Sequence, residues 1–307
     1  MKNREGTSRV LFILSMLIFS TVGIFRRWIP LPSGFIAMVR GLVGALVLFV
    51  ILILSGKRLD KAALIKKLPF LIITGGLIGG NWILLFESYN YTSVAVAVLC
   101  YYMAPSFVML ASPFLLRERL GGSGVVTLVL SFVGMIFVSG AVESGFSLSG
   151  DALIGVLLAL GAAVLYASVI LLNKRNADVD SGTLTVVELL SAGIVVLPYT
   201  LLCEDVSLEG FTPLAIVLLL VLGVVHTGLA YAMYFGSLGS LSARTVAVLG
   251  YIDPIVAVLL SALLLGEEVT PLTIVGAALI LGATLFSELQ KNKGHSPTPK
   301  EDAEEHQ

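Results

Sequence analysis

The chain has 307 residues, of which 57% are hydrophobic and 13% charged, and its formal net charge is −1. A soluble domain has about 25% charged residues, so this composition is typical of a membrane protein and predicts the lipid bilayer as a partner. The near-neutral charge and the lack of a basic patch with interleaved aromatic residues give no sign of a nucleic-acid partner. Cys100 and Cys203 lie in separate apolar runs without metal or redox spacing, so we expect no metal, cofactor or disulfide framework.

Ten apolar runs follow one another along the chain, and each is long enough to cross a bilayer, which takes about 20 residues. Short connections that contain glycine, proline or polar residues separate these runs. The expected spans are 9–27, 33–55, 68–88, 93–115, 122–141, 150–173, 182–203, 212–236, 243–265 and 270–289.

The two ends of the chain are polar. Residues 1–8 contain Lys2 and Arg4 and precede the first span, with no small-residue cleavage site after it, so we expect this span to be retained. Residues 290–307 carry charged residues and prolines and are predicted to be a disordered cytoplasmic tail.

The lysines and arginines indicate the orientation of the spans. If the N-terminus is cytoplasmic, 16 of the 19 lie on the inner side. Arg26 and Arg27 then lie on the outer side, and Arg40 lies within a span. This positive-inside bias predicts a multi-pass protein of the plasma (inner) membrane with both termini in the cytoplasm.

The second half of the chain repeats features of the first at an offset of 147–149 residues. The two units, 9–141 and 150–289, would contain five spans each, and an odd number inverts the second copy in the membrane. We therefore expect an all-α integral membrane protein of ten transmembrane helices arranged as two inverted five-helix repeats. The equivalent pairs are Arg40 and Glu188, Trp82 and Tyr231, Phe86 and Phe235, Tyr102 and Tyr251, and Pro105 and Pro254.

Two related stretches, Tyr102 to Pro105 and Tyr251 to Pro254, lie in the middle of apolar runs. Proline has no backbone N–H to donate, so Pro105 and Pro254 are expected to break their helices. Within a bilayer such a break is tolerated where protein or water satisfies the freed backbone groups. The two breaks thus point to a transport pathway.

Each five-span unit has an aromatic-x-x-Pro stretch in its fourth span and a glutamate, Glu118 or Glu267, thirteen residues after the proline. This layout resembles the EamA branch of the drug/metabolite transporter superfamily, over roughly residues 9–289. The resemblance implies a ten-helix fold, a central substrate cavity and alternating access, usually for the export of small metabolites from bacteria. Glu118 and Glu267 lie at helix ends, where we expect them to bind free N–H groups of the next helix.

Three ionisable residues lie within expected spans, where charged groups usually face a cavity or a partner. Asp253 is the best placed, and its carboxylate would bind a proton or a cationic group; alternatively it pairs with Arg40 or caps backbone that Pro254 has freed. Arg40 and Glu188 are expected at different depths, so we expect no direct pair between them. Both are candidates for substrate binding or coupling, and a purely structural pairing is an equal alternative for each.

Polar and aromatic side chains are expected at a similar depth. Their rings and hydroxyls would line a cavity for an apolar or cationic substrate, although ordinary packing explains any single tyrosine equally well. Tyr251 and Asp253 point in different directions on an ideal helix, and of the two we favour Asp253. The candidates are Asn81, Trp82, Tyr101, Tyr102, Tyr231 and Tyr251.

Two further features have structural explanations. The glycines of the run from Gly75 to Gly80 form interleaved G-x-x-x-G steps, which favour close helix packing. His226 has no partner at a metal-binding spacing, so we interpret it as a hydrogen-bonded structural residue.

These patterns predict a secondary transporter that moves small, amino-acid-like metabolites through a cavity near the membrane midplane, and the resemblance implies the direction of export. The alternative is a proton-coupled exporter of hydrophobic or cationic drug-like compounds. An intramembrane enzyme would need a Ser/His, His-rich or paired-Asp constellation, and the sequence has no such spacing, so no catalytic residue is expected. The partners are then a small-molecule substrate and, in the alternative, protons; monomer and homodimer both stay open.

Overall fold

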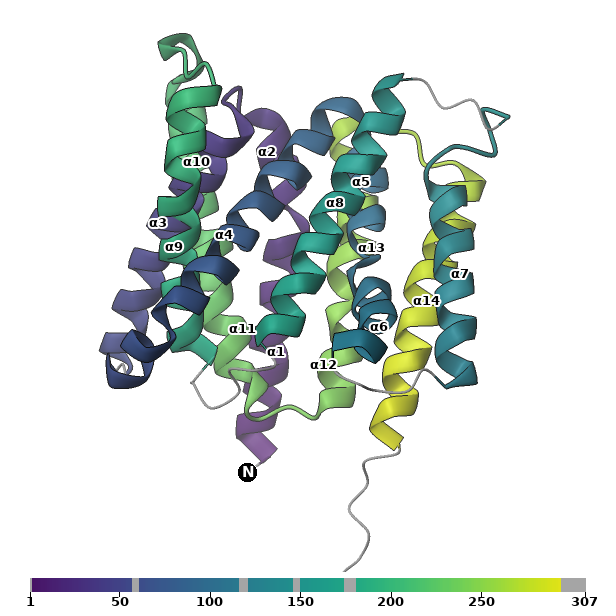
Figure 1. The fold of residues 1–307 in the computed structure, drawn as a ribbon, viewed down its shortest axis with the longest axis horizontal. Helices are drawn as coiled ribbons and strands as arrows, with labels where there is room; N and C mark the ends of the chain where they lie inside the picture. The colour runs from purple at the N-terminus through teal and green to yellow at the C-terminus, as the bar shows by residue number, and fades with distance from the viewer. Residues whose placement is uncertain (1, 57–60, 116–120, 146–149, 174–180, 294–307) are drawn as a thin grey trace, which may run out of the picture.

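The computed structural model describes residues 2–56, 61–115, 121–145, 150–173 and 181–293, and the regular structure within these ranges is helical (Figure 1). The first half contains α1 (Lys2–Ser20), α2 (Val22–Trp28), α3 (Ser33–Leu54), α4 (Lys61–Tyr91), α5 (Val94–Tyr101), α6 (Ala104–Leu115) and α7 (Gly122–Val138). The second half contains α8 (Gly150–Asn173), α9 (Ser181–Cys203), the short η2 (Leu208–Gly210), α10 (Pro213–Gly223), the π-helix η3 (Val224–Leu229), α11 (Ala230–Leu238), α12 (Ala243–Gly250), α13 (Ile252–Leu265) and α14 (Pro271–Lys293).

Eight helical segments in the described ranges are long and apolar enough to cross a bilayer. Two shorter apolar helices, Gly122–Val138 and Pro271–Ser287, coincide with the other two expected runs. The two ends of the chain differ in detail from the expected bounds 1–8 and 290–307. The N-terminal segment is helical from Lys2, and α14 continues to Lys293, whereas residues 294–307 of the expected tail lie outside the described residues.

The helix is interrupted at both Tyr-x-x-Pro stretches. The first run divides into α5 and α6 around Tyr102, and the second divides into α12 and α13 at Tyr251. Pro105 and Pro254 each lie in the first turn of the second helix, where a backbone N–H would have no helical partner in any case. The breaks therefore place helix ends, and the side chains beside them, in the interior of the bundle.

Glycines allow the central helices to approach closely. A Cβ added at Gly75 of α4 would lie 2.6 Å from the carbonyl oxygen of Glu188 on α9, and one at Gly79 would lie 3.1 Å from that of Ala192. This confirms the close packing predicted from the glycine run. On α3, a Cβ at Gly41 would lie 2.9 Å from the carbonyl oxygen of Leu189, so α9 packs tightly against both α3 and α4.

The bundle has two faces, which we name by the chain's first helix. The N-terminal face is where α1 begins, at the bottom of Figure 1, and α14 also ends there. The far face holds α2 and the start of α5 and α10. Helices α3, α4, α9 and α10 are grouped at one side of the bundle, and α7 and α14 pair at the other.

Candidate functional site

Arg40 lies inside the bundle on α3, with 5% of its surface exposed. Its Nε donates to Thr227 Oγ1 at 2.8 Å, and its guanidinium carbon lies 4.4 Å from the centre of the Trp82 ring and 5.6 Å from that of Phe86. No carboxylate forms an ion pair with it in the part of the chain that the structure describes. Arg40 is therefore a buried cation that aromatic faces and a hydroxyl hold in place, with no protein anion to neutralise it.

The position of Thr227 depends on the π-helix η3. Its hydroxyl donates to the carbonyl of Leu222, five residues earlier, while it accepts from Arg40. A Cβ at Gly44 of α3 would lie 2.7 Å from Thr227 Cβ, so only a glycine lets α3 approach this turn. Sequence reasoning missed Thr227. The nearest signal was the glycines at this contact, where Gly44 on α3 faces Thr227 and Gly228 within η3 faces Val47.

Asp253 lies at the start of α13 and is partly buried. Its Oδ2 accepts a hydrogen bond of 2.7 Å from the hydroxyl of Tyr102, at the break between α5 and α6. The two proline breaks are thus joined through a phenol from one and a carboxylate from the other. The suggested ion pair of Asp253 with Arg40 does not form within the described residues, because the carboxylate is held by Tyr102 instead.

Tyrosines connect these two charged groups. Tyr89 on α4 and Tyr231 on α11 each lie near both Arg40 and Asp253, and Tyr231 also lies near Glu188. The Tyr231 ring also packs 5.3 Å from that of Phe19. The central cluster is defined here as Arg40, Trp82, Tyr89, Tyr102, Tyr231 and Asp253.

The other predicted aromatic residues lie around this cluster. Asn81 donates to the carbonyl of Ala162 on α8 at 2.6 Å and hydrogen-bonds the Tyr101 side chain. The Tyr101 ring lies 5.5 Å from that of Tyr166 and 6.4 Å from that of Tyr102. Tyr251 packs, partly buried, against the hydrophobic core.

Glu188 lies on α9 beside the central cluster, near Tyr231, and is 3% exposed. The expectation that Arg40 and Glu188 lie at different depths was wrong, because Gly41, next to Arg40, packs against the backbone of Leu189, next to Glu188. The side chains of Thr74 on α4 and Asn173 on α8 lie at its carboxylate, and the Thr74 hydroxyl also lies within hydrogen-bond distance of the carbonyls of Phe70 and Leu71. Oε1 of Glu188 has no hydrogen-bond partner among the described residues. It forms no ion pair with Arg40 in the described structure. Thr74 and Asn173 were not found from the sequence, because nothing in their local pattern distinguishes them from other polar residues in apolar helices.

The far face is held together by polar contacts between helices. Arg26 donates to Ser33 Oγ at 3.0 Å, and the Ser33 hydroxyl donates to Glu87 at 2.7 Å. Arg27 donates to the carbonyl of Tyr89 at 2.6 Å. The two arginines that the charge pattern assigned to the outer side therefore connect α2 with α3 and α4.

Two carboxylates also cap helices at the far face. Glu204 accepts from the backbone N–H groups of Gly34 and Phe35 at the start of α3, at 2.7 and 2.9 Å. Burial raises the pKa of Glu204 above its ordinary value, and these two N–H groups act in the opposite direction. The carboxylate therefore takes up a proton at a higher pH than an exposed glutamate.

Glu267 caps α5 in the same way, by accepting from the N–H groups of Val94 and Ala95 at 3.0 and 3.3 Å. The expectation that it binds the next helix was wrong, because the fold brings α13 beside α5. Its counterpart Glu118 lies outside the described residues. A shallow surface pocket beside this cap is lined by Arg27, Asn90, Tyr91, Thr92, Ser93, Glu267 and Glu268.

His226 connects η3 to the break between α1 and α2. Its Nε2 lies 2.8 Å from Thr21 Oγ1, its Nδ1 lies 3.2 Å from the carbonyl of Val221, and its ring packs 4.6 Å from that of Phe25. These contacts are structural. No group of three or more His, Cys, Asp or Glu side chains in the described ranges could hold a metal ion.

Comparison with known proteins identifies the kind of molecule that this site belongs to. The EamA-like transporter family matches the chain twice, over residues 7–140 and 153–288. The "uncharacterized transporter YxxF" of Bacillus subtilis (strain 168) is 28% identical over 266 residues, which are 86% of this chain and 83% of that protein. The threonine/homoserine exporter RhtA of Escherichia coli (strain K12) is 28% identical over 229 residues, 74% of this chain and 73% of that protein.

A protein of known crystal structure has the same fold, with a TM-score of 0.67 and 20% sequence identity over 95% of this chain and 99% of that one. The double family match covers nearly the whole sequence. The chain is a multi-pass membrane transporter, not an enzyme, and belongs to the EamA-like transporter family.

Proposed function

We propose that this protein is a secondary transporter that exports amino-acid-like metabolites by alternating access through the central cluster. In this proposal ten spans form two inverted five-helix repeats, with both termini in the cytoplasm of a bacterial cell. The double match to one family and the equivalent proline breaks of α5–α6 and α12–α13 support the repeat. The excess of lysine and arginine on one side supports the orientation.

The observation that carries this proposal is the separation of two opposite charges within one aromatic cluster. Arg40 is held by Thr227 and Trp82, whereas Asp253 is held by Tyr102, and the protein does not pair them within the described residues. An amino acid is a zwitterion, so its carboxylate can bind Arg40 while its ammonium group binds Asp253. Tyr89 and Tyr231, which lie near both charges, would then lie beside the substrate.

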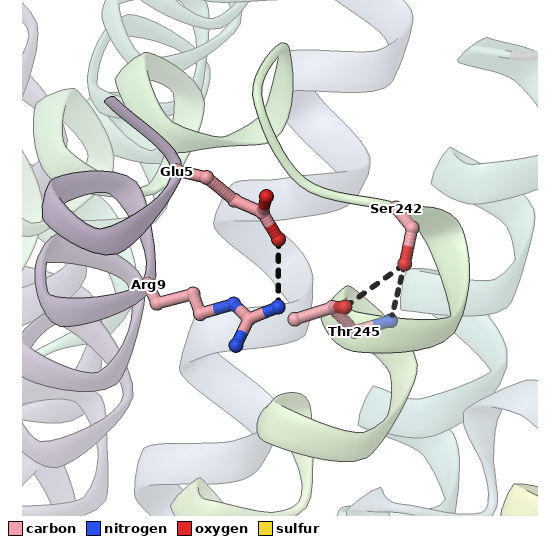
Figure 2. Close-up of polar contacts among 4 residues, drawn as sticks. All are labelled: Glu5, Arg9, Ser242 and Thr245. Atoms are coloured by element: carbon pink, nitrogen blue, oxygen red, sulfur yellow. Dashed lines mark hydrogen bonds and ion pairs between the residues drawn. The ribbon is translucent and has the colours of Figure 1, made fainter. Parts of the chain in front are cut away.

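The two faces of the bundle support alternating access. At the far face, Arg26 and Arg27 donate hydrogen bonds to neighbouring helices, and the carboxylates of Glu204 and Glu267 accept from the first N–H groups of α3 and α5. At the N-terminal face, the contacts drawn in Figure 2 lie within single helices: Arg9 pairs with Glu5 on α1 at 2.6 Å, and Ser242 caps α12 through Thr245. We infer that transport requires the cross-helix bonds of the far face to break.

The direction and substrate class follow the relative that is named a threonine/homoserine exporter. The experiment that tests the substrate class uses purified protein in proteoliposomes loaded with unlabelled threonine, and measures the entry of radiolabelled threonine by exchange. Threonine amide, which lacks the carboxylate, and N-acetylthreonine, which lacks the ammonium group, are the competing ligands. We expect threonine to compete at least tenfold better than either derivative. Absence of threonine exchange by the native protein would overturn the amino-acid assignment.

Variants test which substrate group Arg40 and Asp253 each bind. Arg40→Gln should lose the discrimination against the amide, and Asp253→Asn should lose the discrimination against the N-acetyl derivative, because each variant removes the partner of the missing group. Arg9→Gln is the matched control, since Arg9 is exposed on α1 and pairs with Glu5. Equal discrimination in all three variants would remove the central cluster from the binding site.

A second candidate function is the proton-coupled export of lipophilic cations. It is favoured by the contact of Asp253 with Tyr102 among aromatic rings, which suits a flat or bulky cation. Tetraphenylphosphonium exchange that requires Asp253 but not Arg40 would support this alternative, since a cation has no group for the guanidinium to bind.

A further inference from the structure

Glu188 is a carboxylate in the interior of the bundle for which the described structure provides no cation. It lies two turns into α9 and is 3% exposed. An ionised carboxylate that leaves water without a cation or a full set of donors is strongly disfavoured, and such groups take up a proton instead. The central cluster does not explain why this carboxylate is buried, because the polar groups at Glu188, those of Thr74 and Asn173, are not members of that cluster.

Two buried oxygen atoms at this site have no hydrogen-bond donor among the described residues: Oε1 of Glu188 itself and Oδ1 of Asn173. The side chains of Asn173 and Thr74 interact with the Glu188 carboxylate. A neutral carboxyl group and a primary amide are complementary, since the carboxyl O–H can donate to the amide oxygen while the amide NH2 donates to the other carboxyl oxygen. A proton on Glu188 would therefore satisfy both oxygens.

The packing around Glu188 favours a proton over a larger cation. Thr74 is fully buried, and at the adjacent Gly75 an added Cβ would lie 2.6 Å from the Glu188 carbonyl oxygen. Hard divalent cations take about six oxygen ligands. Among the described residues, the hydroxyl and amide side chains at this carboxylate are those of Thr74 and Asn173. A site with so few ligands and such close helix contacts suits a proton.

The charged and titratable groups around Glu188 come from each neighbouring helix. Tyr166 on α8 and Tyr231 on α11 lie near it. Arg40 on α3 is bound to Thr227 and Trp82. On α4, the charged residues on either side of Thr74 are Lys67 and Glu87, of which Glu87 accepts from Ser33 at the far face. The surroundings of Glu188 are therefore mainly neutral hydroxyl and amide groups.

We propose that Glu188, which lies beside the central cluster without an ion pair to Arg40 in the described structure, is a proton-binding site and carries the coupling proton of transport. The coupling role rests on the proposed function, whereas proton binding does not. The site lies where α4 of the first half meets α8 and α9 of the second half. When the halves rearrange and water reaches Glu188, the proton leaves for that side; when the contact closes, the carboxyl stays protonated. The proton is taken from water on one side and released to water on the other, so no other reactant is needed.

Proton binding is tested first, without any substrate, on the purified full-length protein in detergent. Infrared difference spectra across a pH titration would show the C=O band of a protonated carboxyl, which shifts on exchange into heavy water. We expect Glu188→Gln to remove one such band, and Asn173→Leu to shift its frequency because the amide partner is gone. Glu143→Gln is the control, since Glu143 is an exposed carboxylate on the connection after α7. An unchanged spectrum in Glu188→Gln would overturn the site.

Coupling is tested next in proteoliposomes with radiolabelled threonine. We expect a pH gradient to drive accumulation in the native protein. Glu188→Gln should lose at least tenfold more of this accumulation than of gradient-free threonine exchange. Accumulation driven by a sodium gradient instead, or full pH-driven accumulation in the variant, would overturn the coupling role. Absence of exchange in the native protein would count against the proposed substrate, whereas the infrared result on proton binding would be unaffected.

Discussion

Arg40 and Glu188 lie on packed antiparallel helices, α3 and α9, and occupy equivalent positions of the proposed repeat, but their surroundings differ. Arg40 has a hydroxyl partner in Thr227 and an aromatic face in Trp82. Glu188 has an oxygen with no partner at all among the described residues. Arg40 is thus fixed in place by its neighbours, whereas the hydrogen bonding of the Glu188 carboxylate is incomplete.

The chemistry of the two side chains explains why this difference is useful. A guanidinium stays charged at any physiological pH, so a well-held arginine is a permanent binding partner for an anionic group. A carboxylate can gain or lose a proton when its hydration changes. The comparison suggests that one repeat supplies the fixed charge that selects the substrate, and the other supplies the group that carries a proton.

The most direct way to break this comparison is to neutralise each residue in turn. Arg40→Gln should weaken threonine binding by about 10- to 100-fold, because a hydrogen bond to a charged group contributes about 1.5–3 kcal/mol. Glu188→Gln should change binding by less than about threefold, since it contacts no substrate group. The measurement is the half-saturating threonine concentration for exchange. Equal losses in both variants would show that the two residues act on the same ligand.

The second prediction concerns the packing of α4 against α9, which buries Glu188. Gly75→Ala should destabilise the protein by about 1–3 kcal/mol, because the new methyl group would press on the backbone carbonyl of Glu188. Gly80→Ala on the same helix is the control, since its Cβ would meet only Leu165 Cδ1 at 3.4 Å. Thermal unfolding in detergent should show a lower Tm for Gly75→Ala alone. Equal Tm values would mean that α4 and α9 can separate at little cost.

Much of the architecture could be predicted from the sequence, because its signals are local. Apolar runs, the prolines at 105 and 254, and the glycine run from Gly75 depend on residues close together in the chain, and the structure has helices, helix breaks and a tight contact at these places. The buried positions of Arg40 and Glu188 likewise follow from their lying inside apolar runs.

The partners of the site residues could not be predicted, because they depend on packing between distant segments. Thr227 reaches Arg40 from 187 residues away, and only because a π-helix shifts the register of its turn. Glu267 binds the start of α5, 173 residues earlier, rather than the helix that follows it. Periodicity assigns a face to a residue on its own helix, but it does not say which other helix covers that face.

The third prediction tests whether the partners of Arg40 and Glu188 have the different roles suggested here. Thr227→Val keeps the side-chain shape but removes the hydroxyl that holds Arg40, and we expect about a fivefold weaker threonine binding from the loss of about 1 kcal/mol. Thr74→Val makes the same change beside Glu188, and it should alter the carboxyl infrared band while leaving threonine binding within about twofold. If Thr74→Val weakened binding as much as Thr227→Val, the two regions would not be functionally separate.

The smallest effect is expected from Glu204, which lies just beyond the other end of α9 from Glu188 and has both carboxylate oxygens bound. Its pKa is raised by burial, so the folded protein holds this proton more tightly than the unfolded chain does. The contribution of Glu204 to stability therefore increases as the pH falls from neutrality through the folded pKa, and it levels off below the pKa of the unfolded chain. Glu204→Gln, which cannot titrate, should lack this increase.

We expect the native protein to gain less than about 1 kcal/mol of stability relative to Glu204→Gln over this acidic range, because Glu204 is partly exposed and screened by solvent. The measurement is Tm against pH for the native protein, Glu204→Gln and Glu188→Gln in the same detergent. Because Glu188 has an unpartnered buried oxygen, we expect its protonation to stabilise the fold more than that of Glu204 does. Glu188→Gln should then flatten the pH dependence of Tm more than Glu204→Gln does. If Glu204→Gln flattened the curve more, the main pH-sensitive carboxylate would be Glu204, which caps α3 at the far face. Protonation would then act on the closure of that face.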